Sequence, residues 1–245
     1  MGVALALGAL AACGGSVDAG EPAFRVTTSS ETAQSEAQSQ MQSEAEMEAP
    51  VQAAPDAATS ADQDRLAGVL SRDVVPVGSG GTVVVPGSEP APHAGQERRV
   101  RVEIEGGLPL DGPAVARFVL ATLNDSRSWA ADGLAFSRTD GDADIVVVLA
   151  SPDTSARMCQ PLITGGTLSC REGDRAIITT YRWVNGMEDY GDDLTGYRQY
   201  VVNHEVGHVL GHGHASCPGA GQPAPVMQQQ TKDVDPCVPN PWPYP

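Results

Sequence analysis

The chain has 245 residues, enough for one or two domains, and it is strongly acidic: 31 Asp and Glu side chains against 15 Lys and Arg give a formal net charge of −16. No stretch of the sequence forms a basic stripe, so we exclude a nucleic-acid-binding protein. The acidity instead favours solubility and repulsion from anionic surfaces.

The N-terminus has the pattern of an export signal. Residues 3–12 form an apolar run too short to cross a bilayer as a helix, and no other apolar run is long enough to do so. The run ends in Leu-Ala-Ala-Cys-Gly, which resembles the lipobox of bacterial lipoproteins and implies that Cys13 is lipidated, although the usual positive charge before the run is missing. We therefore predict a lipoprotein signal peptide over residues 1–13. The protein would be extracytoplasmic and membrane-bound through its lipid anchor only, or secreted if the lipobox prediction is wrong.

Residues 14–74 are predicted to form a disordered acidic tether. Residues 14–97 carry 13 acidic side chains against three Arg, and residues 29–61 have almost no large apolar side chain that could join a core. Any transient helix there would lack an apolar stripe to pack with. We therefore expect a single folded domain over residues 75–245.

That domain is predicted to be α+β. Residues 100–104 alternate between apolar and polar side chains, which indicates a half-buried strand. Residues 113–124 indicate a helix, because Pro stands in the first turn and the apolar side chains form one stripe. Residues 145–149 are a continuous apolar run of strand length, typical of a buried central strand.

Two further strands and a long helix follow. The strands are predicted over residues 167–170 and 176–180, joined by a Glu-Gly-Asp turn. The helix is expected over residues 193–210, because acidic residues at its start suit the helix dipole and its apolar residues can face the core. The remaining C-terminal residues are rich in Pro and are expected to be irregular.

Four cysteines follow the signal segment, an even number that suits disulfide bonds in an oxidising compartment. None of their spacings is that of a zinc site. Three pairings are possible. We favour the two local ones, Cys159 with Cys170 across a hairpin and Cys217 with Cys237 around the segment that carries Met227.

An H-E-V-G-H-V-L-G-H-G-H motif occupies residues 204–214. On a helix, His204 and His208 stand one turn apart on a single face, so both imidazoles can reach one metal ion. Gly211 permits the chain to leave the helix with a positive φ, and the turn lets His214 return as a third ligand. Three His ligands with an open fourth position are typical of a catalytic zinc site.

Two other residues of the motif have different expected roles. Glu205 lies beside the ligand face and is free to hydrogen-bond a water on the zinc. His212 fits neither ligand spacing and is predicted to face solvent or to support a ligand. The alternative interpretation is an ordinary helix with solvated or core histidines. Four of the five His in the chain fall inside this motif, and helix packing alone gives no reason for such clustering.

The motif resembles the H-E-x-x-H-x-x-G-x-x-H pattern of the metzincin zinc peptidases. The resemblance implies a twisted mixed β-sheet with a backing helix, an active-site helix and a short irregular C-terminal subdomain. It also implies a methionine turn beneath the zinc at Met227, a residue that would otherwise be read as core filler; the prolines before it suit a tight turn. The tyrosine that some metzincins place after this methionine is absent, since Gln228, Gln229 and Gln230 follow.

The chain also resembles an uncharacterised family, a secreted bacterial domain of unknown function classed as metzincin-like. The resemblance covers roughly residues 76–245 and implies zinc and a peptidase fold, but it supplies no substrate. Ala215, at a position that helps to sort metzincin subfamilies, matches none of them. Four segments carry the resemblance: residues 200–208, 211–214, 225–227 and the Asn-Pro-Trp-Pro-Tyr-Pro terminus at 240–245.

Our first hypothesis is a monomeric, lipid-anchored, extracytoplasmic zinc metallopeptidase that acts on a protein or peptide. His204, His208 and His214 would hold Zn²⁺, which lowers the pKa of bound water toward about 7. Glu205 would take the proton from that water and pass it to the leaving amine. The edge strand preceding Ala176 would align an extended peptide by strand addition.

The alternative hypothesis is a zinc-bearing surface lipoprotein that binds a wall component or a protein partner and hydrolyses nothing. The Trp- and Pro-rich tail, residues 239–245, would then serve as a binding surface instead of packing as an ordered terminus. The presence of Glu205 favours the hydrolase, because a binding-only site needs no base beside the metal.

Overall fold

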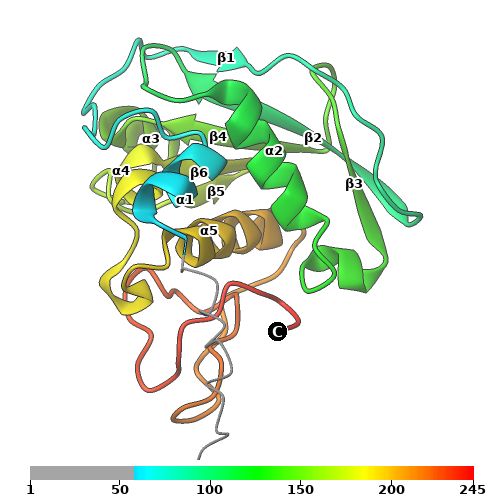
Figure 1. Cartoon of the computed structure of the whole chain (residues 1–245), viewed down its shortest axis with the longest axis vertical. Helices are drawn as coiled ribbons and strands as arrows, with labels where there is room; N and C mark the ends of the chain where they lie inside the picture. The colour runs from blue at the N-terminus through cyan, green and yellow to red at the C-terminus, as the bar shows by residue number, and fades with distance from the viewer. Residues whose placement is uncertain (1–57) are drawn as a thin grey trace, which may run out of the picture. The chain divides into compact units, whose positions relative to one another are not determined.

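The computed structural model describes residues 58–245. The predicted signal peptide with Cys13, and the tether up to residue 57, lie outside the described residues. The described part has the predicted α+β fold, in which one six-stranded sheet is combined with five α-helices (Figure 1). Within residues 58–245, no helix is long and apolar enough to cross a membrane.

The sheet is mixed and has the strand order β1–β2–β4–β6–β5, with β3 pairing to the first half of β2. The pairs β2–β3, β2–β4 and β4–β6 are parallel, whereas β1 and β5 run antiparallel to their neighbours. Among residues 58–245, the last strand, β5, therefore has one edge without a strand partner. The strands are β1 (Thr82–Val84), β2 (Gln96–Glu105), β3 (Leu134–Arg138), β4 (Ile145–Ala150), β5 (Cys170–Glu172) and β6 (Arg175–Thr179).

The central strand β4 is buried along its whole length, as its continuous apolar sequence predicts. Successive side chains of a strand point to opposite faces of the sheet. Val147 and Leu149 accordingly belong to the core that α2 and α5 share, whereas Val146 and Val148 pack with the cystine of Cys159 on the other face.

The helices include both of those predicted, with each end within one residue of the expected position. Asp111 caps the helix that begins at residue 112, and Asp193 caps the one that begins at residue 194; each carboxylate accepts a backbone N–H three residues on. Short 3₁₀ turns precede β3 and α5. The helices are α1 (Ser60–Leu66), α2 (Gly112–Leu123), α3 (Pro152–Met158), α4 (Thr180–Asn185) and α5 (Leu194–Val209).

Two strand predictions need correction. β2 begins four residues before the predicted start, because its first residues are polar and mostly exposed while their backbone still pairs with β3. The predicted strand over residues 167–170 is wrong for its first three residues. Thr167 instead donates its N–H to the carbonyl of Thr164 in a turn, and strand pairing starts only at Cys170.

The predicted tether boundary at residue 75 is too late, because the folded part begins with α1 at Ser60. Arg198 of α5 is fully buried, and its guanidinium donates to Asp64 Oδ1 at 2.6 Å and to the carbonyl of Gln63 at 2.9 Å. These polar contacts dock α1 onto α5. A search for apolar stripes misses them, since the buried side chains of α1 are Gln and Asp.

Residues 210–245 contain no helix or extended strand and form the irregular C-terminal subdomain that was expected. Gln230 lies at its centre and is fully buried. Its amide accepts from the Tyr190 hydroxyl at 2.8 Å and the Asn240 N–H at 3.0 Å, and it donates to the carbonyls of Asn240 and Pro225. Side-chain hydrogen bonds thus take the place of regular backbone pairing in this segment.

The C-terminal tail is an ordered terminus. Trp242 is 5% exposed, and the Arg127 guanidinium lies 4.0 Å from its ring centroid. The side-chain amide of Asn203 on α5 donates to the carbonyl of Pro241 at 2.9 Å. The tail therefore packs against the fold.

Both predicted disulfides are confirmed. Cys159 and Cys170 join the end of α3 to the start of β5, with 5.9 Å between their Cα atoms. Cys217 and Cys237 close a loop within the C-terminal subdomain, with a Cα separation of 5.8 Å. Both distances lie in the normal range for a disulfide.

Candidate metal centre

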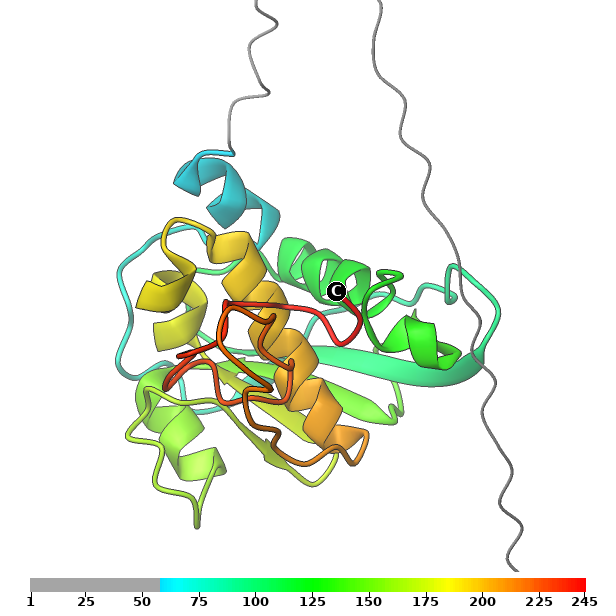
Figure 2. The same ribbon diagram turned by 90° about the horizontal axis from the view of Figure 1, so that it is seen from below.

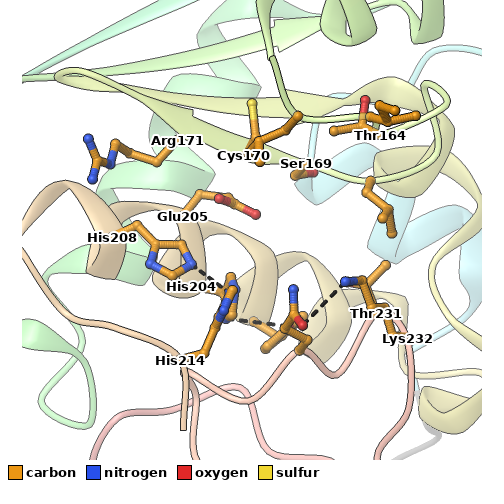
Figure 3. A pocket seen from close by; sticks show the side chains of 15 residues that line it. Thr164, Ser169, Cys170, Arg171, His204, Glu205, His208, His214, Thr231 and Lys232 are labelled. Atoms are coloured by element: carbon orange, nitrogen blue, oxygen red, sulfur yellow. Dashed lines mark hydrogen bonds between the residues drawn. The ribbon is translucent and has the colours of Figure 1, made fainter. Parts of the chain in front are cut away.

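Three histidines converge where α5 meets the C-terminal subdomain. His204 and His208 lie one turn apart on α5, and His214 returns from the segment that follows the helix (Figure 3). One ring nitrogen from each lies within 4.8 Å of the other two, and Nε2 of His208 is 3.1 Å from Nε2 of His214. The structure thus brings together the three residues predicted as metal ligands.

The end of α5 explains how His214 reaches the other two. Gly211 has a φ of +100°, in the region that glycine adopts without strain. The N–H of Gly211 donates to the carbonyl of His208, and the N–H of His212 donates to the carbonyl of Gly207. This pair of hydrogen bonds is a Schellman motif, which ends the helix and reverses the chain. The predicted helix-ending role of Gly211 is confirmed.

Backbone carbonyls orient the two helical imidazoles. Nδ1 of His204 lies 2.8 Å from the carbonyl of Val226, and Nδ1 of His208 lies 2.9 Å from the carbonyl of His212. A carbonyl can only accept, so each Nδ1 carries the proton and each Nε2 is left with a free lone pair. These hydrogen bonds fix the ring orientation and tautomer that metal-binding histidines require.

The environment favours the neutral form of His204 and His214. Burial lowers the pKa of His204 to about 3, with the Val226 carbonyl opposing the shift and the neighbouring imidazoles adding to it. Burial, followed by the charges of His208 and Lys232, also lowers the pKa of His214. A neutral imidazole is the form that ligates a metal.

Met227 lies in a turn beneath α5, as the methionine-turn interpretation expects. The N–H of Gln228 donates to the carbonyl of Pro225 at 2.8 Å and closes the turn. The carbonyl of Met227 accepts the N–H of Ala215 at 3.0 Å, so the turn also holds the residue next to His214. Figure 2 shows the C-terminal segment, in orange and red, lying across α5.

The sequence analysis missed the role of Gly207. A Cβ atom at this position would lie 2.6 Å from Sδ of Met227 and 2.6 Å from Cζ2 of Trp129. The helix therefore needs glycine here so that Met227 and Trp129 can pack directly against its backbone between the two helical histidines. No local pattern reveals this, because the contacts come from residues distant in sequence.

His212 stays outside the metal cluster, as predicted. Its ring stacks on Trp129 with 4.4 Å between centroids, and Trp129 Nε1 donates to the carbonyl of Asn203. The Asn203 amide oxygen in turn accepts from the hydroxyl of Ser128 at 2.7 Å. The segment around Trp129 thus supports both ends of the motif, another contact that the sequence did not predict.

Tyr200 is a further supporting residue that the sequence analysis did not single out. Its hydroxyl donates to the carbonyl of Gln228 at 2.9 Å and accepts the N–H of Gln230 at 2.8 Å. The same oxygen lies 3.4 Å from Nδ1 of His204. Tyr200 therefore fixes the segment after Met227 against α5.

Glu205 is buried beside the histidines and points toward the space between α5 and β5 (Figure 3). Burial raises the pKa of this carboxyl group to about 8. Within the part of the chain that the structure describes, its Oε2 atom has no hydrogen-bond partner. A buried, unpartnered carboxyl oxygen is costly in a fold and is a common sign of a functional site.

An open cleft of about 340 Å³ exposes this group of residues. One wall comes from β5 and the segment before it, whose Leu162 and Ile163 are 58% and 98% exposed. The opposite wall comes from α5 and from residues 229–232. Both walls therefore offer residues that can contact a ligand bound at the histidines.

The chain belongs to a family of proteins of unknown function (DUF3152), whose family model matches residues 71–245. This range agrees closely with the expected resemblance over residues 76–245. No curated protein and no solved structure matches the chain.

Proposed function

We propose that the protein is an extracytoplasmic zinc-dependent peptidase related to the metzincins. The observation that carries the proposal is the convergence of three imidazoles beside a buried carboxyl group at an open cleft. Carboxylate, imidazole and an open position form the set of groups that metal-assisted hydrolysis uses.

The residues fit zinc. His204, His208 and His214 offer three nitrogen ligands, and nitrogen is a preferred donor for zinc. Three protein ligands leave a fourth position open, as in catalytic sites. When bound there, Zn²⁺ would lower the pKa of water and polarise the carbonyl group of a substrate. The motif resemblance and the turn at Met227 support the assignment.

Glu205 would act as the general base. Its unpartnered oxygen is available to accept a proton from the attacking water and to pass it on to the leaving amine. The pKa of about 8 applies to the metal-free protein. A cation beside the carboxyl group favours its ionised form, so metal binding would put it in the state that a base requires.

The edge strand β5 would align the substrate. It forms the last strand of the sheet and one wall of the cleft, so an extended peptide can add to its free edge while lying over the histidines. The Tyr200 hydroxyl is engaged by two backbone groups, so we assign it a supporting role and no proton transfer.

The proposed location rests on sequence and disulfides together. The lipobox-like segment ending at Cys13 implies a lipid anchor, and two disulfides are compatible with an oxidising compartment outside the cytoplasm. The non-hydrolytic binding protein stays the alternative hypothesis. Glu205 beside the histidines favours the hydrolase, and the burial of Trp242 removes the largest side chain of the tail from the surface that a partner would contact.

The test measures zinc stoichiometry and cleavage of a mixed peptide library, with and without a chelator. Glu205→Gln should retain zinc and lose about 10²–10⁴-fold in cleavage rate, because only the base is removed. His214→Ala should lose zinc, whereas His212→Ala should change neither quantity. Zinc loss in His212→Ala with zinc retained in His214→Ala would refute the ligand assignment, and full activity of Glu205→Gln would refute the mechanism.

A further inference from the structure

The cleft has the opposite charge to the rest of the chain. The whole chain carries a formal net charge of −16. Among the residues that line the cleft, however, Glu205 is the only acid, and Arg171 and Lys232 are both present. Glu205 is buried between the histidines, whereas Arg171 and Lys232 are exposed, so the open walls of the cleft are cationic.

Both cations are available to a ligand. Arg171 is exposed on β5, and neither it nor Lys232 joins an ion pair among residues 58–245, although eight other arginines there do. Nζ of Lys232 donates to Oε1 of Gln229 at 3.2 Å, a contact that uses one of its three N–H groups. Two N–H groups of the Lys232 ammonium therefore remain available to a ligand at the cleft wall.

The two cations stand at opposite ends of the metal centre. Figure 3 shows Arg171 on the side of His208 and Lys232 on the other side, with Glu205 and the histidines between them. A peptide extended along the cleft would pass one cation before the scissile bond and the other after it.

We propose that the cleft selects acidic peptides, with an Asp or Glu side chain on each side of the scissile bond. This inference rests on the proposed peptidase function and names its substrate class. Carboxylates in the substrate would pair with Arg171 and Lys232. The planar guanidinium of Arg171 can donate two parallel hydrogen bonds to one carboxylate, a bidentate pair. Basic peptides would be attracted to the acidic outer surface but would meet like charges in the cleft, which adds discrimination against them.

The test compares three peptides that share one apolar centre and carry Glu, Gln or Lys on both sides of it. Their binding to the zinc-loaded full-length Glu205→Gln protein is measured by fluorescence anisotropy, so no cleavage is required. We expect the Glu peptide to bind about three- to tenfold more tightly than the Gln peptide, as for two exposed charge pairs. The preference should shrink at 1 M salt, where the Debye length is about 3 Å.

Single variants assign each side, measured with two further peptides that carry Glu on one side of the apolar centre and Gln on the other. In the same background, Arg171→Gln should abolish the preference for Glu on one side of the peptide only, and Lys232→Gln the preference on the other side. Arg117→Gln is the matched control, because Arg117 is exposed on α2 outside the cleft and its loss changes the net charge equally.

The two proposals fail in different ways. Equal affinity for the Glu and Gln peptides, or an Arg117→Gln effect as large as that of the cleft variants, would overturn the charge preference. Cleavage of the Gln peptide by the wild-type protein tests the peptidase itself. Tight binding of the Glu peptide without any cleavage would refute the peptidase and leave the charge preference standing.

Discussion

Replacing Gly207 with Ala tests whether the floor of the metal centre is as tightly packed as its distances indicate. The added methyl carbon would lie 2.6 Å from both Sδ of Met227 and Cζ2 of Trp129. Optimal carbon contacts are about 3.5–4.0 Å, so one or both neighbours must move by about 1 Å. Trp129 resists movement, because its Nε1 is hydrogen-bonded to Asn203 and its ring is stacked on His212.

The expected loss of stability is the difference between two effects. Overpacking a close-packed site costs about 1–3 kcal/mol, whereas Gly→Ala in a helix interior gains about 1 kcal/mol. Because the added carbon would clash with two neighbours at once, the upper part of the overpacking range applies, about 2–3 kcal/mol. We therefore expect a net loss of about 1–2 kcal/mol for Gly207→Ala. Each kcal/mol lowers Tm by about 2–4 °C in a domain of this size, so Tm should fall by about 2–8 °C.

Zinc affinity should fall as well, by about tenfold. A displaced Met227 moves its neighbour Val226, whose carbonyl orients His204, and loss of such support typically weakens metal binding about 10–100-fold. Tm would be measured in excess chelator, and zinc affinity by competition with a chromophoric chelator. Gly213→Ala is the matched control, because a Cβ atom there meets nothing within 4 Å. A Gly207→Ala protein as stable as the wild type, or more stable, would show that helix propensity dominates and that the packing argument fails.

Three further outcomes are expected. Deleting residues 14–56 should leave Tm unchanged, whereas deleting residues 14–72 should cost about 3–5 kcal/mol, because Arg198 would remain as a buried charge without Asp64; equal Tm values would contradict the docking of α1. Burial raises the pKa of Glu205 from 4.5 to about 8, so in metal-free protein the folded state holds a proton that the unfolded state releases. Its contribution to stability is then fully present below about pH 4.5 and is lost as the pH rises toward about 8. The Tm advantage of Glu205→Gln over wild type should grow across that range in chelator, and a constant difference would exclude the linkage. Finally, Cys13→Ser should release the protein from the membrane fraction, and unchanged membrane association would remove the lipid anchor.

The sequence predicted that the three histidines come together because that information is local. His204 and His208 are related by one helical turn, and Gly211 is the residue type that the chain reversal before His214 requires. The disulfides were predictable for a similar reason, since both close short loops between neighbouring elements.

The supports of the centre were not predictable, because they depend on contacts between distant segments. In the sequence, nothing distinguishes Trp129 from other core aromatic residues, because its contacts with α5 exist only in the folded chain. The need for glycine at residue 207 likewise follows only from the packing of Met227 against the helix. The docking of α1 was hidden for another reason. Its buried residues are Gln63 and Asp64. The Gln63 amide bonds the backbone of Asp192 and Thr195, and the Asp64 carboxylate pairs with Arg198, so their burial is favourable only once α5 is in place.

The hydrogen bonds between α5 and the C-terminal subdomain have a consequence for the order in which the chain is made. The acceptor for His204 is the carbonyl of Val226, and the acceptor for Asn203 is the carbonyl of Pro241. A chain synthesised as far as His214 therefore contains all three candidate ligands and the carbonyl that orients His208, but not the carbonyl that orients His204. The candidate metal centre can therefore reach its described geometry only after residues 215–241 have been added and have packed against α5.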